Sequence, residues 1–560
     1  MPLPFLNHSP PRAIGAIGSH EDTEFHKGES LFSSPHYLKI ISFILSLAIS
    51  SALYANPAGS INIRDFGAKG DGKTVDTKAI NDAIDAAAKQ GGGTVYFPAG
   101  TFLSYSIHLK SNISLYLDQG CTLLAADSAA GGRYDEPEPG PDNKFQDYGH
   151  SHWHNSLIWG ESLQNVSILG PGTIFGKGLS RGFTASEHWE RLGVNARPYL
   201  IAGGANKAIA LKLCRNVILK DFTIIYGGHF GILATGVDNL TIDNLKIDTN
   251  RDGIDIDCCN NVRISNCTVN SPYDDAICLK SSYALGYAKA TQNVTITNCQ
   301  VSGYDLGTFY DGTYQRKEFN QVPDQEGPAG RIKFGTESNG GFKNITISNC
   351  VFDYCRGLAL ETVDGALLED VTITNITMRD IVNSPIFLRL SARMRGPEGT
   401  PVGKLRRVMI SNVIAYNADS HFAALISGLP GNDIEDVKLN NIRIYYRQID
   451  SPLSKIQTAV PQYEKTYPEP QKFGVLPAYG FFIRHAKNIE LNNVEISYIG
   501  KETRSAFVLD DVKGIELRNI KAQPVSRAWL FALKNVSDFN INDSKGIKDR
   551  TISKTVETKF

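Results

Sequence analysis

The chain has 560 residues, of which 42% are hydrophobic, enough apolar material for a large core. Its 57 basic and 58 acidic residues give a net charge of −1, which argues against nucleic acid or an anionic membrane as the main partner, because both usually call for a basic excess. The 51 glycines and only 4 methionines favour a turn-rich β protein over a helical one.

The N-terminal segment has the pattern of a secretory signal. Lys39 precedes an apolar run over residues 40–49, and small residues follow up to Ala55. The run is shorter than the roughly 20 apolar residues that a membrane-spanning helix needs. We therefore expect a signal peptide over residues 38–55, no stable membrane span, and a periplasmic or secreted mature protein. Residues 1–37 are interpreted as an unstructured extension or a misassigned start.

A helix is predicted before the first repeats, with Asp76 or Thr77 as its N-cap and Gly91–Gly93 as its stop. Such a helix would cover the open end of the first coil, an edge that could otherwise recruit other chains. Its apolar side chains at helical spacing are Ile80, Ala83, Ile84 and Ala87.

One short pattern recurs along most of the chain: a polar residue, apolar residues in alternation, then Asn and another apolar residue. The starts at Asn239 and Asn261 lie 22 residues apart. Alternation with period two indicates strands with one inward face, and a unit of this length must stack on its neighbours to bury that face. Propeller blades and leucine-rich repeats need other spacings. The sequence therefore predicts an all-β fold, a single-stranded parallel β-helix over residues 56–545, with a C-terminal tail over 546–560.

The recurring Asn is expected at the corner between strands, where it tolerates a left-handed backbone. The same register places Cys267, Cys299 and Cys350 where other coils carry residues such as Leu245 or Ile376. We interpret these cysteines as inward apolar fillers and not as a disulfide or metal set. No essential disulfide is expected.

Two acidic segments on neighbouring coils are the main candidates for chemistry. One holds Asp252; the other, 22 residues on, holds Asp274 and Asp275. Carboxylates stacked about 4.8 Å apart along a sheet repel one another and raise one pKa, which supplies a protonated acid beside ionised bases. Inverting glycosidases place such a pair roughly 6.5–9.5 Å apart, with room for water. A calcium site or solvated loop acids are the alternative interpretation.

A family resemblance supports the hydrolase interpretation. The segments Ile63–Gly72 and Phe97–Phe102 resemble the start of pectin-degrading β-helix proteins. The strings Asn250…Asp252-Gly253 and Asp274-Asp275 resemble the paired signatures of the polygalacturonases, family 28 of the glycoside hydrolases.

This resemblance covers roughly residues 60–525. It implies a right-handed, pectin-lyase-like solenoid and an inverting hydrolase of a pectic polysaccharide or oligosaccharide. By that likeness Asp274 would be the general acid, while Asp252 and Asp275 would activate the water. It implies neither a metal nor a cofactor, and we expect a monomer.

Two coils depart from the family pattern, which has Gly-His-Gly on the coil after the acids and Arg-Ile-Lys one coil further. Here Arg331 stands where the His is expected, and Ala359 and Glu361 replace the Arg and the Lys. The string Arg331–Lys333 imitates the second motif one coil too early. Because Glu361 would repel a uronate unless protonated, we expect unmodified polygalacturonan to be a poor substrate and a rhamnogalacturonan-type glycan to be a better one.

Other side chains are weaker candidates for substrate contact. Lys280 is a suitable cation for a uronate. Trp153, on a loop, would stack on a sugar. His229 would either line a subsite or pack in a turn. His150, His152 and His154 would share one face if extended, an arrangement that could bind a metal, but a loop lining the cleft is favoured and no metal site is expected. The predicted contacts are Lys280, Arg331, Lys333, His229, Glu361 and Trp153.

Two rival classes remain open. A polysaccharide lyase on the same fold would abstract a proton with Arg or Lys beside acid-bound calcium. A non-catalytic carbohydrate-binding β-helix, such as an adhesin or tailspike, would not require Asp252 to stack with Asp274 and Asp275.

Overall fold

The computed structural model describes residues 59–127, 131–139, 144–146, 149–180, 202–249, 251–316, 328–449 and 453–560. The expected extension and signal peptide, residues 1–55, lie outside these ranges, as does Asn250. The described ranges belong to one compact unit, Gly59–Phe560. Within them, no helix combines the length and the hydropathy that crossing a membrane requires.

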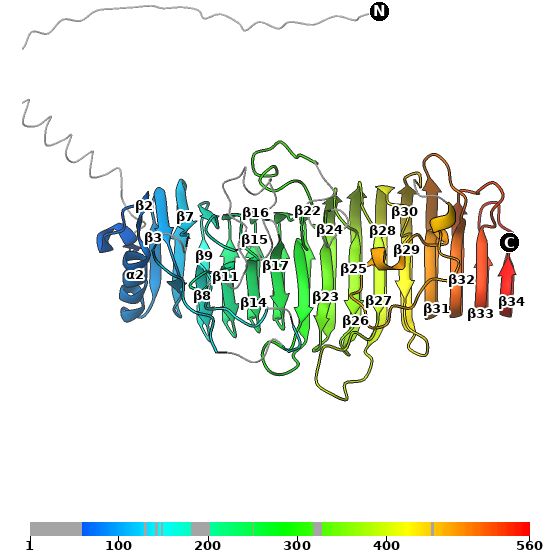
Figure 1. Cartoon of the computed structure of the whole chain (residues 1–560), viewed down its shortest axis with the longest axis horizontal. Helices are drawn as coiled ribbons and strands as arrows, with labels where there is room; N and C mark the ends of the chain where they lie inside the picture. Colours follow the sequence, from blue (N-terminus) through cyan, green and yellow to red (C-terminus); the bar gives the residue numbers. More distant parts are fainter. Residues whose placement is uncertain are drawn as a thin grey trace, which may run out of the picture. The chain divides into compact units, whose positions relative to one another are not determined.

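The unit is a parallel β-helix whose strands stack in three ladders (Figure 1). The first ladder contains β1 (Ile61–Asn62), β3 (Gly93–Phe97), β6 (Ile113–Leu117), β9 (Gln164–Leu169), β12 (Arg215–Lys220), β15 (Asp238–Asp243), β18 (Asn260–Ser265), β21 (Thr291–Thr297), β24 (Phe342–Asp353), β26 (Leu367–Arg379), β28 (Lys404–Ala418) and β30 (Ile434–Tyr446). The second contains β2 (Asp71–Val75), β4 (Gly100–Ser104), β7 (Cys121–Ala125), β10 (Thr173–Phe175), β13 (Thr223–Ile225), β16 (Lys246–Asp248), β19 (Thr268–Asn270) and β22 (Gln300–Ser302). The third contains β5 (Ile107–His108), β8 (Ile158–Glu161), β11 (Lys207–Lys212), β14 (Phe230–Thr235), β17 (Asp252–Asp257), β20 (Ile277–Ser281), β23 (Ile332–Ser338), β25 (Leu358–Thr362), β27 (Ile386–Leu390) and β29 (Ala424–Ser427).

The core is a set of apolar columns that run from coil to coil, as the alternation predicted. In the first ladder Leu240 pairs with Val262, and Ile242 with Ile264. These side chains are buried, while the residues between them face outward. No single coil can bury such a face alone, so each repeat buries its apolar residues by stacking on the coils before and after it.

The recurring Asn residues occupy the corners, also as predicted. Asn239 and Asn261 have φ of 57° and 58°. The Asn261 side-chain amide donates to Asn239 Oδ1 at 2.7 Å, and Asn239 donates to Asn216 at 3.0 Å. The left-handed backbone therefore coincides with a ladder of amide hydrogen bonds between coils.

The predicted N-terminal cap is present as α2 (Thr77–Lys89), which buries the four expected apolar residues and precedes left-handed glycines at Gly91–Gly93. Asp76 is its N-cap residue, but its side chain accepts hydrogen bonds from the Lys69 and Gly70 amides at 2.7 and 3.0 Å. The carboxylate thus fixes the approach to the helix. The short 3-10 helices are η1 (Ile63–Phe66), η3 (Leu453–Lys455) and η4 (Pro470–Phe473).

The C-terminal end differs from the expected tail. Long strands β31 (Ala478–Tyr498), β32 (Ser505–Ala522) and β33 (Phe531–Asn542) continue the parallel stack. Within residues 546–560, β34 (Arg550–Lys559) pairs antiparallel with β33. Phe560 stacks on Phe531 at 5.0 Å between ring centroids. This segment therefore covers the last coil's edge instead of leaving it as a free tail.

The predicted inward position of the in-register cysteines is confirmed. Cys267, Cys299 and Cys350 are buried in the main core, and Cys350 pairs in register with Ile376. All nine cysteines fall in the described part of the chain, where each is a free, buried thiol. Burial also raises the pKa of thiols such as Cys259, which disfavours the reactive thiolate.

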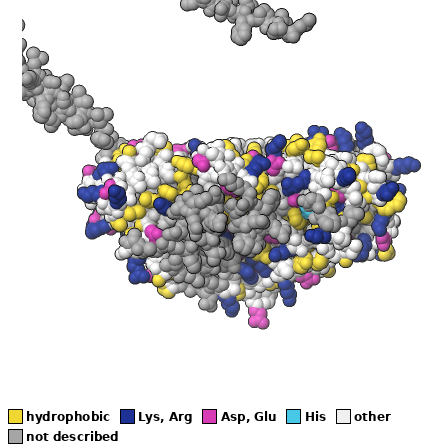
Figure 2. Space-filling view, turned by 45° about the horizontal axis from the view of Figure 1, so that its top comes forward, with side chains coloured by type: hydrophobic (Ala, Val, Ile, Leu, Met, Phe, Trp, Pro, Cys, Tyr) yellow, Lys and Arg dark blue, Asp and Glu magenta, His cyan; other side chains and the backbone are white. Residues whose placement is uncertain are grey.

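Basic and acidic side chains are interspersed over the described part of the face in Figure 2, with apolar ones scattered between them. This mixture agrees with the near-zero net charge. Attraction for a charged ligand must therefore come from a local arrangement.

Candidate active site

The outward face of the third ladder carries the predicted acids. Every position of β17 is buried, whereas β15 of the first ladder alternates between buried and partly exposed residues. Ile254 pairs with Ile277, 23 residues on, so Asp252 lies opposite Asp275. The expected step of 22 residues, which paired Asp252 with Asp274, is wrong by one. Asp274 instead precedes the first paired position of β20.

The fold nonetheless brings the three aspartates together. One carboxylate oxygen from each of Asp252, Asp274 and Asp275 lies within 4.8 Å of the others. The Asp275 backbone amide donates to Asp252 Oδ1 at 3.2 Å and to Asp274 Oδ1 at 3.0 Å. Three acids in so small a volume cannot all ionise at equal cost.

Asp275 is the ionised member of this group. Burial alone would raise its pKa, but Lys333 and Arg331 together lower the pKa to about 2. The Arg331 Nε donates to Asp275 Oδ1 at 2.9 Å, and Lys333 Nζ lies 3.3 Å from Oδ2. A carboxylate held in this form can orient or activate a water molecule.

Asp252 is shifted in the opposite direction to Asp275. Burial, together with the charges of Asp255 and Asp274, raises its pKa well above the usual value. Arg251 donates to Asp274 Oδ2 at 2.6 Å. In this structure the raised pKa therefore falls on Asp252, whereas the resemblance assigns the acid role to Asp274.

Lys280 lies at the centre of a second group of polar side chains. Its Nζ is 2.7 Å from His150 Nε2, 3.3 Å from Asp255 Oδ2 and 3.5 Å from Glu337 Oε2. Burial would lower the Lys280 pKa, but Asp255 and Asp252 raise it well above its ordinary value. The Lys280 charge, which was predicted to bind a uronate, is thus already paired with carboxylates of the protein itself.

His150, Asp252 and Asp255 have the donor types and the closeness of a metal site, with ligand atoms within 4.8 Å. The Lys280 ammonium, however, lies 3.6 Å from Asp252 and 3.3 Å from Asp255. It therefore provides a positive charge at the place where a cation would otherwise be held.

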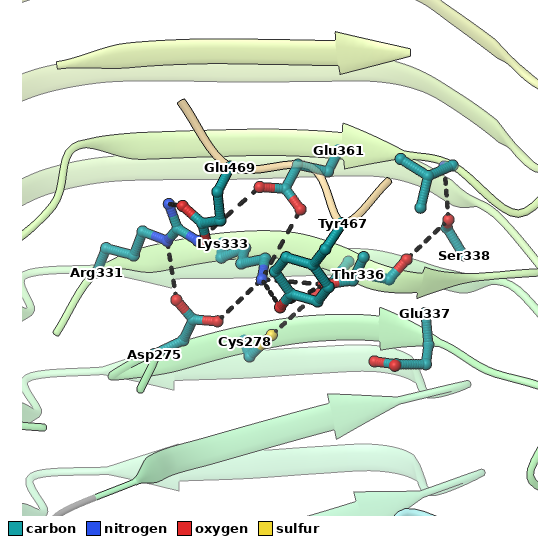
Figure 3. A network of polar contacts seen from close by, with 12 residues as sticks. Asp275, Cys278, Arg331, Lys333, Thr336, Glu337, Ser338, Glu361, Tyr467 and Glu469 are labelled. Carbon is teal, nitrogen blue, oxygen red and sulfur yellow. Dashed lines mark hydrogen bonds and ion pairs between the residues drawn. The ribbon is translucent and has the colours of Figure 1, made fainter. Parts of the chain in front are cut away.

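A second network follows on the next coils (Figure 3). Tyr467 and Glu469 reach over β23 from a distant loop: Arg331 Nη2 donates to Glu469 Oε1 at 2.5 Å, and Lys333 Nζ donates to the Tyr467 hydroxyl at 3.1 Å. Glu361 lies 3.8 Å from Lys333. Burial raises the pKa of Glu361 to about 8, although Lys333 and Arg331 act in the opposite direction.

Comparisons with known proteins bear on the family and the fold of the chain. The family described as "Rhamnogalacturonase A/epimerase, pectate lyase-like" matches residues 60–166, and "Right handed beta helix region" matches residues 201–314. A "Probable polygalacturonase" from Vitis vinifera is 28% identical over 403 residues, covering 64% of this chain and 75% of that protein. The chain is polygalacturonase-like. Its predicted right-handed parallel β-helix is confirmed.

Two further proteins extend the likeness. An "Endo-polygalacturonase" from Pectobacterium carotovorum subsp. carotovorum is 25% identical over 331 residues, covering 56% of this chain and 79% of that protein. The solved structure of a Yersinia enterocolitica family 28 exopolygalacturonase superposes with a TM-score of 0.59 at 20% identity, covering 84% of this chain and 80% of that one. At that identity the structure supports the fold alone.

Trp153 does not have the place predicted for it in this polygalacturonase-like site. The side chain is fully buried, packs on Ala210 and Leu233, and donates from its indole nitrogen to Thr235 Oγ1 at 3.0 Å. The expectation that it stacks on a sugar is wrong, because neither ring face is accessible. Near the acids, the aromatic residue Tyr467 is 40% exposed, although Lys333 holds its hydroxyl.

The histidines divide among separate surroundings. His150 contacts Lys280, whereas His154 pairs with Glu161 at 2.9 Å and stacks on Trp159. His229 is buried beside Phe230, and burial lowers its pKa well below the usual value. His150 and His154 therefore point to different partners and do not share one site.

Sequence reasoning missed several members of the site. Asp255 carried a signal, because it alternates with the inward Ile254 and Ile256 and so had to face outward. His150 was noticed but linked to no carboxylate. The others arrive from a bulged strand or a distant loop: Glu337, Tyr467 and Glu469.

Proposed function

We propose that this chain is a secreted glycoside hydrolase that cleaves a pectic polysaccharide or oligosaccharide containing galacturonic acid. The observation that carries the proposal is the cluster of Asp252, Asp274 and Asp275, in which the pKa of Asp275 is lowered and that of Asp252 is raised. Relatives named as polygalacturonases support a pectic substrate. Secretion rests on the N-terminal signal pattern.

Hydrolysis with inversion needs a proton for the leaving oxygen and a base for the attacking water. We assign Asp274 as the acid and Asp252 and Asp275 as the groups that hold the water. The Asp252 pKa is raised, in part by the charge of Asp274, and the two carboxylates lie close enough for a proton to pass between them. With the proton on Asp274, Asp252 is ionised beside Asp275 and can hold the water with it.

The first experiment measures reducing ends released from pectic glycans by the wild type and by Asp252→Asn, Asp274→Asn and Asp275→Asn. Loss of a general acid or base should lower turnover by about 10²–10⁴-fold while the fold is retained. Asp243→Asn is the matched control, because Asp243 lies on the outward face of β15. Equal activity in all five proteins would contradict the assignment.

Proton NMR of the first-formed sugar then fixes the reaction class. Inversion supports the two-carboxylate mechanism, whereas a retained anomer contradicts it. An unsaturated product that absorbs in the near ultraviolet would identify a lyase instead.

The leaving-side sugar is the finer part of the proposal. Because its pKa is about 8, Glu361 is protonated in a weakly acidic medium and would not repel a uronate there. Arg331 and Lys333, however, are already engaged by Asp275, and Arg331 also by Glu469. A neutral sugar such as rhamnose therefore suits this position better than a uronate.

The test compares catalytic efficiency on polygalacturonan and on rhamnogalacturonan-type fragments, in the wild type and in Glu361→Lys. The wild type should prefer the mixed backbone, and the substitution should move the preference toward the homopolymer. If the wild type prefers the homopolymer and the substitution changes nothing, Arg331 and Lys333 form the uronate clamp themselves.

A further inference from the structure

From β11 to β31, a single column of side chains runs along the outward face of the third ladder, one from each coil. In order these are Ala210, Leu233, Asp255, Cys278, Lys333, Ala359, Phe387, Leu425 and Phe482. Its two ends are apolar and its middle is polar. A glycan that lies along the β-helix axis would have to pass over this column.

One apolar end of the column is covered. Trp153 packs on Ala210, Leu233 and Phe230 in a buried cluster. The Trp153 backbone amide donates to the Glu138 carboxylate at 3.0 Å, which holds this segment in place. The face over β11 and β14 is therefore filled by protein.

The other apolar end is covered by residues 460–476, here called the strap. Phe473 and Leu476 of the strap lie in one buried cluster with Ala359, Phe387 and Leu425. This packing places the strap over β25, β27 and β29. The face is again filled by protein.

Two buried arginines hold the strap by its backbone. Arg389 donates to the carbonyls of Gln462 and Tyr463 at 2.7 and 3.1 Å. Arg484 donates to those of Val460 and Pro461 at 2.9 and 2.7 Å. Hydrogen bonds from a charged donor are stronger than neutral ones, so the strap is a fixed part of the surface.

Between the two covers lie three consecutive coils, marked by Asp255, Cys278 and Lys333. At a strand spacing of about 4.8 Å these three coils, here called the window, span roughly 10 Å, about the length of two sugar rings. Their own side chains are buried, and solvent reaches the acids at Asp274, whose side chain is 16% exposed. Tyr467 stands at the strap side of the window, its hydroxyl 3.1 Å from Lys333 Nζ. Tyr467 is 40% exposed, and Lys333 Nζ lies 5.2 Å from its ring centroid, so the opposite ring face is the one that would stack on a sugar.

We propose that the enzyme acts at a chain end: one end of a pectic glycan enters this window, stops against Tyr467 of the strap, and loses a short product of uniform length. The inference rests on the proposed hydrolase function. An enzyme that cuts within a polymer needs a binding face that continues past the acids in both directions. Here protein covers that face on both sides of the acids, which favours cleavage at a chain end. The strap ends that face one coil beyond Asp275, at Lys333.

The wild-type enzyme alone provides the first test. Viscosity and reducing ends are followed together on polygalacturonan and on rhamnogalacturonan-type polymer, and early products are separated by chromatography. Chain-end action gives steady release of reducing ends, little loss of viscosity, and one short product from the start. A rapid fall in viscosity with mixed long products would overturn this inference while supporting the hydrolase function. No cleavage of any pectic glycan would overturn both.

Variants of the strap test the role assigned to Tyr467. Tyr467→Ala should give a broader set of product lengths, whereas Tyr467→Phe keeps the ring and should keep the single product. Tyr416→Ala is the control, because Tyr416 is similarly exposed, at 43%, but lies on β28 of the first ladder. Unchanged products from Tyr467→Ala would show that this ring does not set the product length.

Discussion

The first and third ladders are built from the same coils but differ in how far their outward faces are buried. In β15, Leu240 and Ile242 are buried while the residues between them are partly exposed. In β17, fourteen positions later along the chain, all six residues are buried, including Asp255 and Asp257. Burying a charge is costly unless it is paired, so such residues need partners from other coils and loops.

The difference shows how one repeat carries both scaffold and chemistry. On the first ladder, ion pairs such as Arg443–Glu495 at 2.8 Å lie at the surface, where solvent screens them. On the third ladder the charges are screened little and determine one another's pKa, as Lys333 and Arg331 do for Asp275. Buried outward acids on a solenoid strand are therefore a sign of a reactive site.

The largest effect on stability is expected from Arg331→Ala. This change leaves the carboxylates of Asp275 and Glu469 buried without the guanidinium that pairs with both. Removing one partner of a buried ion pair costs about 3–5 kcal/mol of unfolding free energy. Urea-induced unfolding followed by circular dichroism measures the loss.

The matched control for that variant is Arg443→Ala on the first ladder. Arg443 is half-exposed and pairs only across the surface with Glu495, so its unfolding midpoint should stay nearly unchanged. Equal losses in Arg331→Ala and Arg443→Ala would remove the distinction between the two faces.

The repeat allowed the scaffold to be predicted, because each coil buries its own alternating residues against identical neighbours. The corner positions of Asn239 and Asn261 and the inward cysteines follow from that register. The three aspartates were found because their residue types are unusual on a strand. The step between these two coils is 23 residues and not the expected 22. Asp252 was therefore predicted to pair with Asp274, whereas it lies opposite Asp275.

The covers over the third ladder could not be predicted in the same way. Trp153 and Tyr467 both lie on long connections that no repeat describes, and the local pattern around them does not say which strand they pack against. Tertiary packing turned Trp153 inward and brought Tyr467 and Glu469 from more than a hundred residues away to Lys333 and Arg331. Their roles therefore emerge only from the folded arrangement.

A smaller effect, with opposite sign on the two faces, is expected from pH. Burial raises the Glu361 pKa from 4.5 to about 8, so the folded state binds that proton more tightly than the unfolded state. Its contribution to stability is complete below about pH 4.5 and is lost as the pH rises through about 8. The melting temperature of the wild type should therefore fall over that pH window, and the melting temperature of Glu361→Gln should fall less.

Asp243 on the first ladder provides the opposite case. Burial opposes ionisation there, but hydrogen bonds from Lys220 and Ser265 together outweigh it and lower the Asp243 pKa below 3.8. Its contribution is therefore present above pH 3.8 and is lost as the pH falls through the lowered pKa. Asp243→Asn should alter only the acid side of the melting profile. A change above neutral pH would contradict the comparison.

The smallest effect is expected at the corners, where the amide ladder is repeated many times. Asn441 has φ of 56°, donates to Asn412 at 2.9 Å and accepts from Asn493 at 2.7 Å. Asn441→Ala loses these hydrogen bonds and places a Cβ in the left-handed region, for roughly 1–2 kcal/mol. Asn441→Gly loses the same hydrogen bonds but adopts the left-handed backbone without strain. Chemical unfolding should therefore rank Gly between the wild type and Ala, since backbone strain adds to the loss of the amide ladder only in the Ala variant. If Gly and Ala are equally destabilised, the hydrogen-bond ladder alone selects Asn at the corners, and the left-handed backbone contributes nothing to that choice.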